Sequence, residues 1–167
     1  MKVINLWGGK KSYVSDRDYS RVRRYSWGLD GNGKYASTKI RIDGKRRRVA
    51  LHRYILGVTD PKVFVDHVDR NPLNNLRSNL RICSNSQNQA NRLKKFARKA
   101  GRFKGVYWRP KKNAWVSEIT HNKNRHYLGI FQSEIEAAKA YNQKAIELFG
   151  EFALLNRCDA ETIKEVA

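Results

Sequence analysis

The chain has 167 residues, of which 40% are hydrophobic, enough for one large domain or two small ones. Its formal net charge of +20 predicts a polyanionic partner; nucleic acid is the default, because no basic amphipathic helix indicates a membrane surface. The N-terminus lacks the apolar core of a signal peptide, and no segment approaches the ~18 apolar residues of a membrane span. Two distant cysteines without a C-x-x-C pattern indicate neither a zinc ribbon nor a disulfide framework, so we expect a cytoplasmic protein that is not secreted.

The first fifty residues are expected to be mainly β structure, with Asp16 and Asp18 capping a short helix or turn. Tyr35–Ile42 alternates in places and runs into Asp43-Gly44, a dipeptide that is a strong hairpin signal between two such runs. The return strand is basic, so the ribbon could lie along a phosphate backbone or in a DNA groove, unless its cations are merely solvated. Its candidate DNA-binding residues are Arg46, Arg47 and Arg48.

The stretch from Val63 to Arg92 concentrates the residues that carry chemistry. An apolar run typical of a buried strand, Val63–Val65, ends on Asp66-His67 and is followed by an asparagine-rich loop. A second apolar segment, Leu80–Cys83, precedes a polar helix that begins with the Ser/Gln spacing of a capping box. The order predicts strand, loop, strand and helix. Four polar side chains can then converge: Asp66, His67, Asn79 and Asn88.

These four side chains suit phosphodiester hydrolysis, which needs an activated water and a metal that stabilises charge on the phosphate. Asp66 and Asn88 can supply oxygen ligands of the kind that Mg²⁺ prefers. His67 is placed to deprotonate water. An unperturbed imidazole has a pKa of roughly 6.5, which suits a base near neutral pH. Asn79 could hydrogen-bond the other ring nitrogen and fix the tautomer. His52, by contrast, is expected to be a packed or hydrogen-bonded structural histidine.

The segment DHVDRNPLNNLRSNLRICSNSQN, which starts at Asp66, resembles the ββα-metal motif of HNH nucleases, most closely that of phage intron-associated HNH homing endonucleases. LHRYILG, from Leu51, resembles the segment that these enzymes carry before the motif. The resemblance implies that Asp66 and Asn88 bind a divalent metal, Mg²⁺ (or Mn²⁺), that His67 is the general base and that Asn79 orients it. Asn88 stands where other members have a final histidine. Products with 3′-hydroxyl and 5′-phosphate ends, a homing role and a phage or bacterial setting are implied in the same way.

Residues 93–102 are predicted to form a basic linker, which either continues the preceding helix or orders on DNA. The linker contains no acidic residue, so it is a poor core former and a good phosphate binder. Its candidate DNA-binding residues are Lys94, Lys95, Arg98, Lys99 and Arg102.

Residues 103–160 are predicted to form a second module of three strands followed by one helix. Phe103–Arg109, Ala114–Thr120 and Arg125–Phe131 are strand-like, and a capping-box spacing starts the helix at Ser133. GVYWRP, WVSEI, YLGIF, EAAKAYNQKA and FALLN resemble the motif series of the APETALA/ethylene-response-factor DNA-binding domain. That domain reads the major groove with its sheet. The resemblance implies DNA contacts at Lys104, Arg109, Trp115, Glu118, Arg125 and Tyr127.

The predicted fold class is therefore α+β: N-terminal β hairpins plus a ββα-metal motif in residues 1–92, then the linker, then a three-stranded antiparallel sheet packed on one helix. We expect a metal-dependent endonuclease that binds double-stranded DNA and needs no small-molecule cofactor. One metal site cuts one strand, so a monomer would nick, and a double-strand break would need a homodimer or a second visit. Two alternatives stay open: a non-catalytic DNA-binding regulator and a structural RNA-binding protein.

Overall fold

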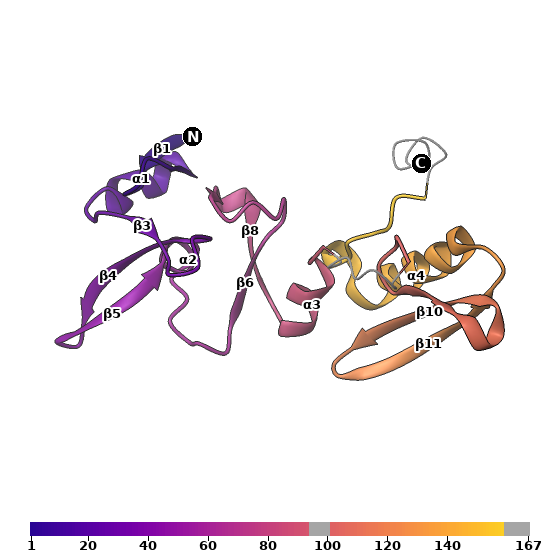
Figure 1. Ribbon diagram of the computed structural model, residues 1–167. Helices are drawn as coiled ribbons and strands as arrows, with labels where there is room; N and C mark the ends of the chain where they lie inside the picture. The colour runs from indigo at the N-terminus through magenta and orange to yellow at the C-terminus, as the bar shows by residue number, and fades with distance from the viewer. Residues whose placement is uncertain (94–100, 159–167) are drawn as a thin grey trace. The chain divides into compact units, whose positions relative to one another are not determined.

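The computed structural model describes residues 1–93 and 101–158 of the chain (Figure 1). The chain divides into two compact units, Met1–Ser84 and Asn85–Ala167. Both units contain helices and short antiparallel strand pairs, which confirms the predicted α+β class. None of the described helices is long and apolar enough to span a membrane.

The first unit is built from short strands around two short helices. Its strands form three small sheets, in the orders β1-β2-β7, β3-β4-β5 and β6-β8. The strands are β1 (Lys2–Asn5), β2 (Lys11–Val14), β3 (Gly28–Leu29), β4 (Ala36–Ile42), β5 (Lys45–Ala50), β6 (Phe64–His67), β7 (Asn74–Asn75) and β8 (Leu80–Cys83). The helices are α1 (Asp16–Val22), α2 (Leu51–Leu56) and the single 3₁₀ turn η1 (Arg77–Asn79).

The predicted Asp43-Gly44 hairpin is confirmed. It joins β4 to β5 in register, with Ile42 opposite Lys45. Asp43 has φ of 49° and Gly44 has φ of 74°, and two positive φ values in a row are what the tight turn between twisted antiparallel strands requires. The turn therefore fixes which residues of the two strands lie opposite one another.

One buried cluster holds the elements of the first unit together. Trp27, Val14, Val22, Leu51 and Ile55 are each at most 1% exposed and belong to it. The Trp27 indole nitrogen donates to the carbonyl of Val22 at 2.9 Å, so its polar atom is satisfied inside the core. Each fully buried large side chain of this kind contributes about 1.5–3 kcal/mol of transfer free energy.

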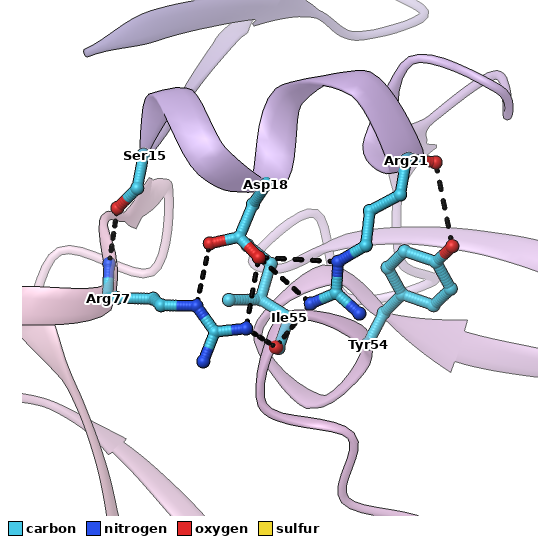
Figure 2. A network of polar contacts seen from close by, with 6 residues as sticks. All are labelled: Ser15, Asp18, Arg21, Tyr54, Ile55 and Arg77. Atoms are coloured by element: carbon cyan, nitrogen blue, oxygen red, sulfur yellow. Dashed lines mark hydrogen bonds and ion pairs between the residues drawn. The ribbon is translucent and has the colours of Figure 1, made fainter.

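A buried ionic network sits beside this cluster, and it corrects the capping role expected for Asp18. The helix α1 does begin at Asp16, but its N-cap is Ser15, and the Asp18 side chain is only 2% exposed. Arg77 donates to both Asp18 carboxylate oxygens, at 2.8 and 3.0 Å, and Arg21 Nη2 donates to one of them at 2.9 Å (Figure 2).

The same network reaches two further backbone elements. Both guanidinium groups also donate to the carbonyl of Ile55 at the end of α2, and the backbone N–H of Arg77 donates to the Ser15 hydroxyl at 2.9 Å (Figure 2). Burial pushes the pKa of Asp18 upward, but the hydrogen bonds and positive charges of Arg77 and Arg21 outweigh it and leave that pKa below its usual value. Asp18 thus links α1, α2 and the segment that leads into β8.

The described residues of the second unit, 85–93 and 101–158, form a short helix, a three-stranded sheet and one long helix. The sheet is antiparallel in the order β11-β10-β9, and α4 packs on one of its faces (Figure 1). This confirms the predicted sheet and helix. The elements are α3 (Asn85–Ala90), β9 (Val106–Arg109), η2 (Pro110–Lys112), β10 (Ala114–His121), β11 (Asn124–Phe131), α4 (Glu134–Phe149) and η3 (Gly150–Phe152).

The long helix starts where the sequence predicted. Ser133 is its N-cap, and the Ser133 hydroxyl accepts a hydrogen bond from the backbone N–H of Ile135 at 3.2 Å. Tyr141, Ala145 and Phe149 then point onto the sheet, where they pack with Ile119. Helix and sheet thus share one small apolar core.

We predict that Asp18→Asn destabilises the first unit by about 3 kcal/mol, because removing one partner of a buried ion pair leaves the arginines without their counter-charge. Urea unfolding at neutral pH measures the loss. Asp16→Asn is the matched control, since Asp16 is an exposed neighbour on the same helix turn whose carboxylate pairs with the N-terminal amine.

The lowered pKa of Asp18 also predicts how the stability difference between wild type and Asp18→Asn changes with pH. Because the folded-state pKa of Asp18 is lowered, its contribution is present above the unfolded pKa of about 3.9 and is lost as pH falls through the folded value. The stability gap between wild type and Asp18→Asn should therefore shrink in strong acid. A gap that stayed constant with pH would contradict the ionic account.

Candidate active site

The strand pair β6–β8 positions the two central residues of the candidate site. Asp66 lies opposite Arg81, and His67 lies opposite Leu80. Because successive side chains of a strand point to opposite faces, Asp66 and His67 face different ways. The Arg81 guanidinium donates twice to Asp66 Oδ2, at 3.1 and 2.9 Å, and both side chains are largely buried. The Asp66 carboxylate is therefore held in place by a charged partner.

His67 is held by an asparagine from a neighbouring sheet. Its Nε2 lies 3.2 Å from Oδ1 of Asn75, which is fully buried in β7. Asn75 Nδ2 donates to the Ser12 hydroxyl at 2.9 Å and to the carbonyl of Pro72 at 3.3 Å. A carbonyl can only accept, so the amide nitrogen must face Pro72 and the amide oxygen must face His67. His67 Nε2 is then the donor, and neutral His67 has its lone pair at Nδ1.

This geometry corrects the role predicted for Asn79. Its amide oxygen accepts from the backbone N–H of Asp69 at 2.9 Å, and its nitrogen donates to the Asp69 carboxylate and to the carbonyl of Asn74, each at 2.8 Å. Asn79 therefore closes the loop that presents Asn75, and Asn75 makes the contact with the His67 ring that was expected of Asn79. The sequence signal for Asn75 was its place in the Asn-Asn pair of the motif.

The surroundings of His67 keep its imidazole neutral. The ring is 5% exposed, stacks with Tyr35 at a centroid distance of 6.1 Å and meets the ring of His52 edge-on at 5.2 Å. Burial lowers the pKa of His67 below its usual value and outweighs the hydrogen bond that His67 donates to Asn75 and the negative charge of Asp69, which act the other way.

His52 is a packed histidine, as predicted. It is buried, its ring also lies 5.2 Å from that of Tyr35, and burial lowers the pKa of His52 to about 3. His52 is thus an uncharged side chain that packs beside the candidate base, His67.

Asn88, the second predicted metal ligand, lies on α3 in the second unit. Its side chain is half-buried and makes no hydrogen bond within the described part of the chain. The helix itself is well held: the backbone N–H of Asn122 donates to the Ser86 hydroxyl at 3.1 Å, and Ala90 packs in the cluster of α4. Asp66 and Asn88 belong to different units, so their pairing stays a prediction.

Lys104 has a different role from the DNA contact that was predicted. Its ammonium donates to the carbonyls of Gln89 at 3.2 Å, of Arg92 at 2.9 Å and of Ala90. These are carbonyls at the C-terminal end of α3, where a helix leaves acceptors unsatisfied and a cation is favoured. Lys104 therefore fastens the helix that carries Asn88.

The sheet of the second unit presents a polar face on the side away from α4. Strand register places four of the predicted contact residues there: Arg109, Glu118, Arg125 and Tyr127. Arg125 and Tyr127 are exposed, and the Glu118 carboxylate pairs with Arg125 at 3.4 Å. We call these four residues the sheet face. They are the part of the predicted DNA surface that the fold brings together.

Trp115 does not lie on the sheet face, where a DNA contact was expected of it. It lies on the α4 side of the sheet, half-buried against Val106, Ala137 and Ala138, because it stands three residues before Glu118 on β10 and successive side chains of a strand point to opposite faces. Trp115 is a core residue of the second unit.

The remaining predicted contacts divide into three groups. Arg46, Arg47 and Arg48 are exposed on β5. Arg102 pairs with Glu134 at the start of α4, with Nε 3.0 Å from the carboxylate. Four linker residues lie outside the described residues: Lys94, Lys95, Arg98 and Lys99.

Two family models match different parts of the chain. An HNH endonuclease family model matches residues 50–90, and an AP2 domain model matches residues 101–151. The chain belongs to the HNH endonuclease family. No solved structure matches it.

Three viral proteins are similar to the chain, and the first of them shows the family. An uncharacterized HNH endonuclease, L560, of Acanthamoeba polyphaga mimivirus is 33% identical over 156 residues, spanning 90% of this chain and 77% of the relative. Protein 3.8 of Escherichia phage T7 is 27% identical over 110 residues, which are 65% of this chain and 88% of the relative. The H-N-H endonuclease F-TflI of Escherichia phage T5 is 37% identical over 62 residues, which are 33% of this chain and 32% of the relative.

We predict that Lys104→Met weakens α3, because three carbonyls lose their cationic donor while the aliphatic part of the side chain is kept. Hydrogen exchange of the α3 amides should become faster, by roughly fivefold or more for a loss of about 1 kcal/mol. Lys112→Met is the matched control, since Lys112 is exposed on η2. Unchanged exchange in α3 would contradict the role of Lys104.

We predict that Asn75→Asp moves the pH dependence of nicking. Wild-type activity should be level near neutral pH and fall only below about pH 6.5, because the pKa of His67 is lowered and the base must be unprotonated. A carboxylate at position 75 would stabilise the imidazolium and shift that acid limb upward by about one unit or more.

The control for this shift is Asn71→Asp, which adds the same charge at an exposed position of the same loop. A rate lowered by the same factor at every pH would show that Asn75 acts through stability alone.

Proposed function

We propose that this HNH family member is a metal-dependent DNA endonuclease that hydrolyses one phosphodiester bond in each visit to double-stranded DNA. The observation that carries the proposal is the state of His67. It is a buried and neutral imidazole whose Nε2–H is committed to Asn75, so that its basic lone pair lies at Nδ1. A fixed neutral imidazole beside a fixed carboxylate is the arrangement that general-base hydrolysis needs.

In the proposed reaction, His67 Nδ1 takes a proton from a water molecule, and the water oxygen bonds to phosphorus. The bond from phosphorus to the 3′ oxygen breaks, and that oxygen takes up a proton to leave a 3′-hydroxyl and a 5′-phosphate. The imidazolium that forms is favoured by the negative charges of Asp69 and Asp66 and by the hydrogen bond to Asn75. Asn79 supports this geometry at one remove, by closing the loop that carries Asn75.

The proposed metal ligands are Asp66 and Asn88. A carboxylate and an amide oxygen fit the preference of Mg²⁺ for oxygen ligands, with water and substrate phosphate completing its shell, and they would also accept Mn²⁺. Arg81 keeps the Asp66 carboxylate fixed, as a ligand for a small ion requires. When bound, the ion would stabilise negative charge on the phosphate and on the leaving oxygen.

DNA binding is proposed for the sheet face and for Arg46 and Arg48, two exposed cations of β5, with the duplex as partner. The cations among them contribute to the net charge of +20, and the structure gives their positions on the surface. A single site of this kind nicks one strand as a monomer. A homing role in the cytoplasm of a bacterial host is part of the proposal and rests on the likeness to phage enzymes.

We expect the protein to convert supercoiled plasmid to open circle with Mg²⁺ or Mn²⁺ and not with EDTA. His67→Ala should slow this conversion by roughly 10²-fold or more, the usual contribution of a general base, and leave DNA affinity nearly unchanged. The control is His126→Ala, which removes another imidazole on β11 in the second unit.

Two outcomes would count against the proposal. Loss of binding in step with loss of cutting would show that His67 is structural. DNA binding by the wild type without cutting under every metal, on plasmid and on DNA of the host genome, would favour the non-catalytic regulator.

A further inference from the structure

The ribbon formed by β4 and β5 has two chemically different faces. In its register, Lys39 lies opposite Arg48 and Arg41 lies opposite Arg46. Since directly opposed residues share a face, one side of the ribbon carries four cations in two opposed pairs. We call this set the basic face: Lys39, Arg41, Arg46 and Arg48.

The other side of the ribbon is mainly apolar. There Ile40 lies opposite Arg47, Ile42 lies opposite Lys45 and Thr38 lies opposite Val49. Ile40, Ile42 and Val49 are half-buried, whereas every residue of the basic face is exposed. We call this second side the apolar face. Its two cations each stand opposite an isoleucine, so they are not stacked against other cations.

The basic face is an arrangement that folding alone would not favour. Like charges directly opposite one another in a sheet are destabilising. In the described part of the chain none of the four cations makes an ion pair. Asp30, an acid near the base of the ribbon, is close enough for the charge of Arg48 to lower its pKa, but its carboxylate accepts hydrogen bonds from the backbone N–H groups of Lys34 and Tyr35, at 2.7 and 3.1 Å. The Asp43-Gly44 turn and the apolar face hold the register in spite of the repulsion.

The dimensions of the basic face fit the charge density of a duplex. Two residues along a strand span about 6.8 Å, and neighbouring strands lie about 4.8 Å apart, which gives a two-by-two array of cations. Double-stranded DNA carries about one negative charge per 1.7 Å of its axis, hence about four over the length of the array. A two-stranded ribbon is also narrow enough to enter the major groove. In Figure 1 the ribbon extends away from α1 and α2 of its own unit, and the four side chains of the basic face are exposed.

We propose that the basic face is the surface with which the first unit binds the phosphates of duplex DNA. Lys39 and Arg41 are contacts that the basic run of β5 did not reveal, and Arg47 is excluded because it points to the apolar face. This deepens the proposed function and rests on it, since the duplex is taken to be the substrate.

The test compares two double variants of the full-length protein. Arg46→Gln/Arg48→Gln removes two charges from the basic face, and Lys45→Gln/Arg47→Gln removes two from the apolar face of the same strand. Affinity for a duplex is measured by fluorescence anisotropy over a range of KCl concentrations, with EDTA present to prevent cutting.

The basic-face variant should lower the salt slope by about 1.8 and weaken binding roughly 30-fold at physiological salt. The control variant should keep the wild-type slope and stay within about twofold in affinity, because distant charges are screened. Thermal unfolding of the basic-face variant should be no lower than that of the wild type, since a repulsive stack has been relieved.

Equal losses in the two variants would show only a general field effect and would overturn the proposal, as would an unchanged slope in the basic-face variant. A larger loss of affinity for structured RNA than for the duplex would reassign the partner. Failure of the nuclease proposal is seen separately, in the wild-type nicking assay. If the wild type never nicks DNA but the basic-face variant still lowers the salt slope of binding by about 1.8, the proposed binding surface is supported and the proposed nuclease activity is rejected.

Discussion

The fully buried side chain of Asn75 joins the framework of the first unit to its chemistry. Its nitrogen is fixed by Ser12 of β2 and by the carbonyl of Pro72, so only its oxygen can face His67. One amide therefore selects the tautomer of the candidate base. Because a buried polar group that loses its partner costs about 1–3 kcal/mol, stability and the state of the base depend on the same few contacts.

Charge in this chain is divided between a few paired acids and many displayed cations. With 35 basic and 15 acidic residues, the acids that the fold buries are matched to arginines, which leaves the excess on the surface. Internal pairing shapes the structure, whereas the unpaired excess produces the field that attracts DNA and makes binding salt-dependent. The internal pairs are Asp18 with Arg21 and Arg77, Asp66 with Arg81, and Glu134 with Arg102.

Local pattern was enough to predict the α+β class, the β4–β5 turn and the sheet and helix of the second unit, because periodicity and turn residues act over short distances. Long-range choices were not accessible. Asn75 and Asn79 are the same residue type, and only the path of their loop decides which one meets His67. Alternation along β10 puts Trp115 and Glu118, three residues apart, on opposite faces, but only packing against α4 decides which of the two faces is covered. The role of Lys104 depends on its hydrogen bonds to carbonyls at the end of α3, which sequence spacing does not indicate.

The most direct test of this account is the protonation state of one ring. ¹⁵N NMR of the imidazole groups, with His67 assigned by comparison with His67→Ala, reports tautomer and pKa together. The account predicts neutral His67 with its proton on Nε2 at neutral pH and a pKa below about 6.5. A proton on Nδ1, or an imidazolium at neutral pH, would contradict it, because the lone pair of the candidate base would then be absent from the place that Asn75 assigns to it.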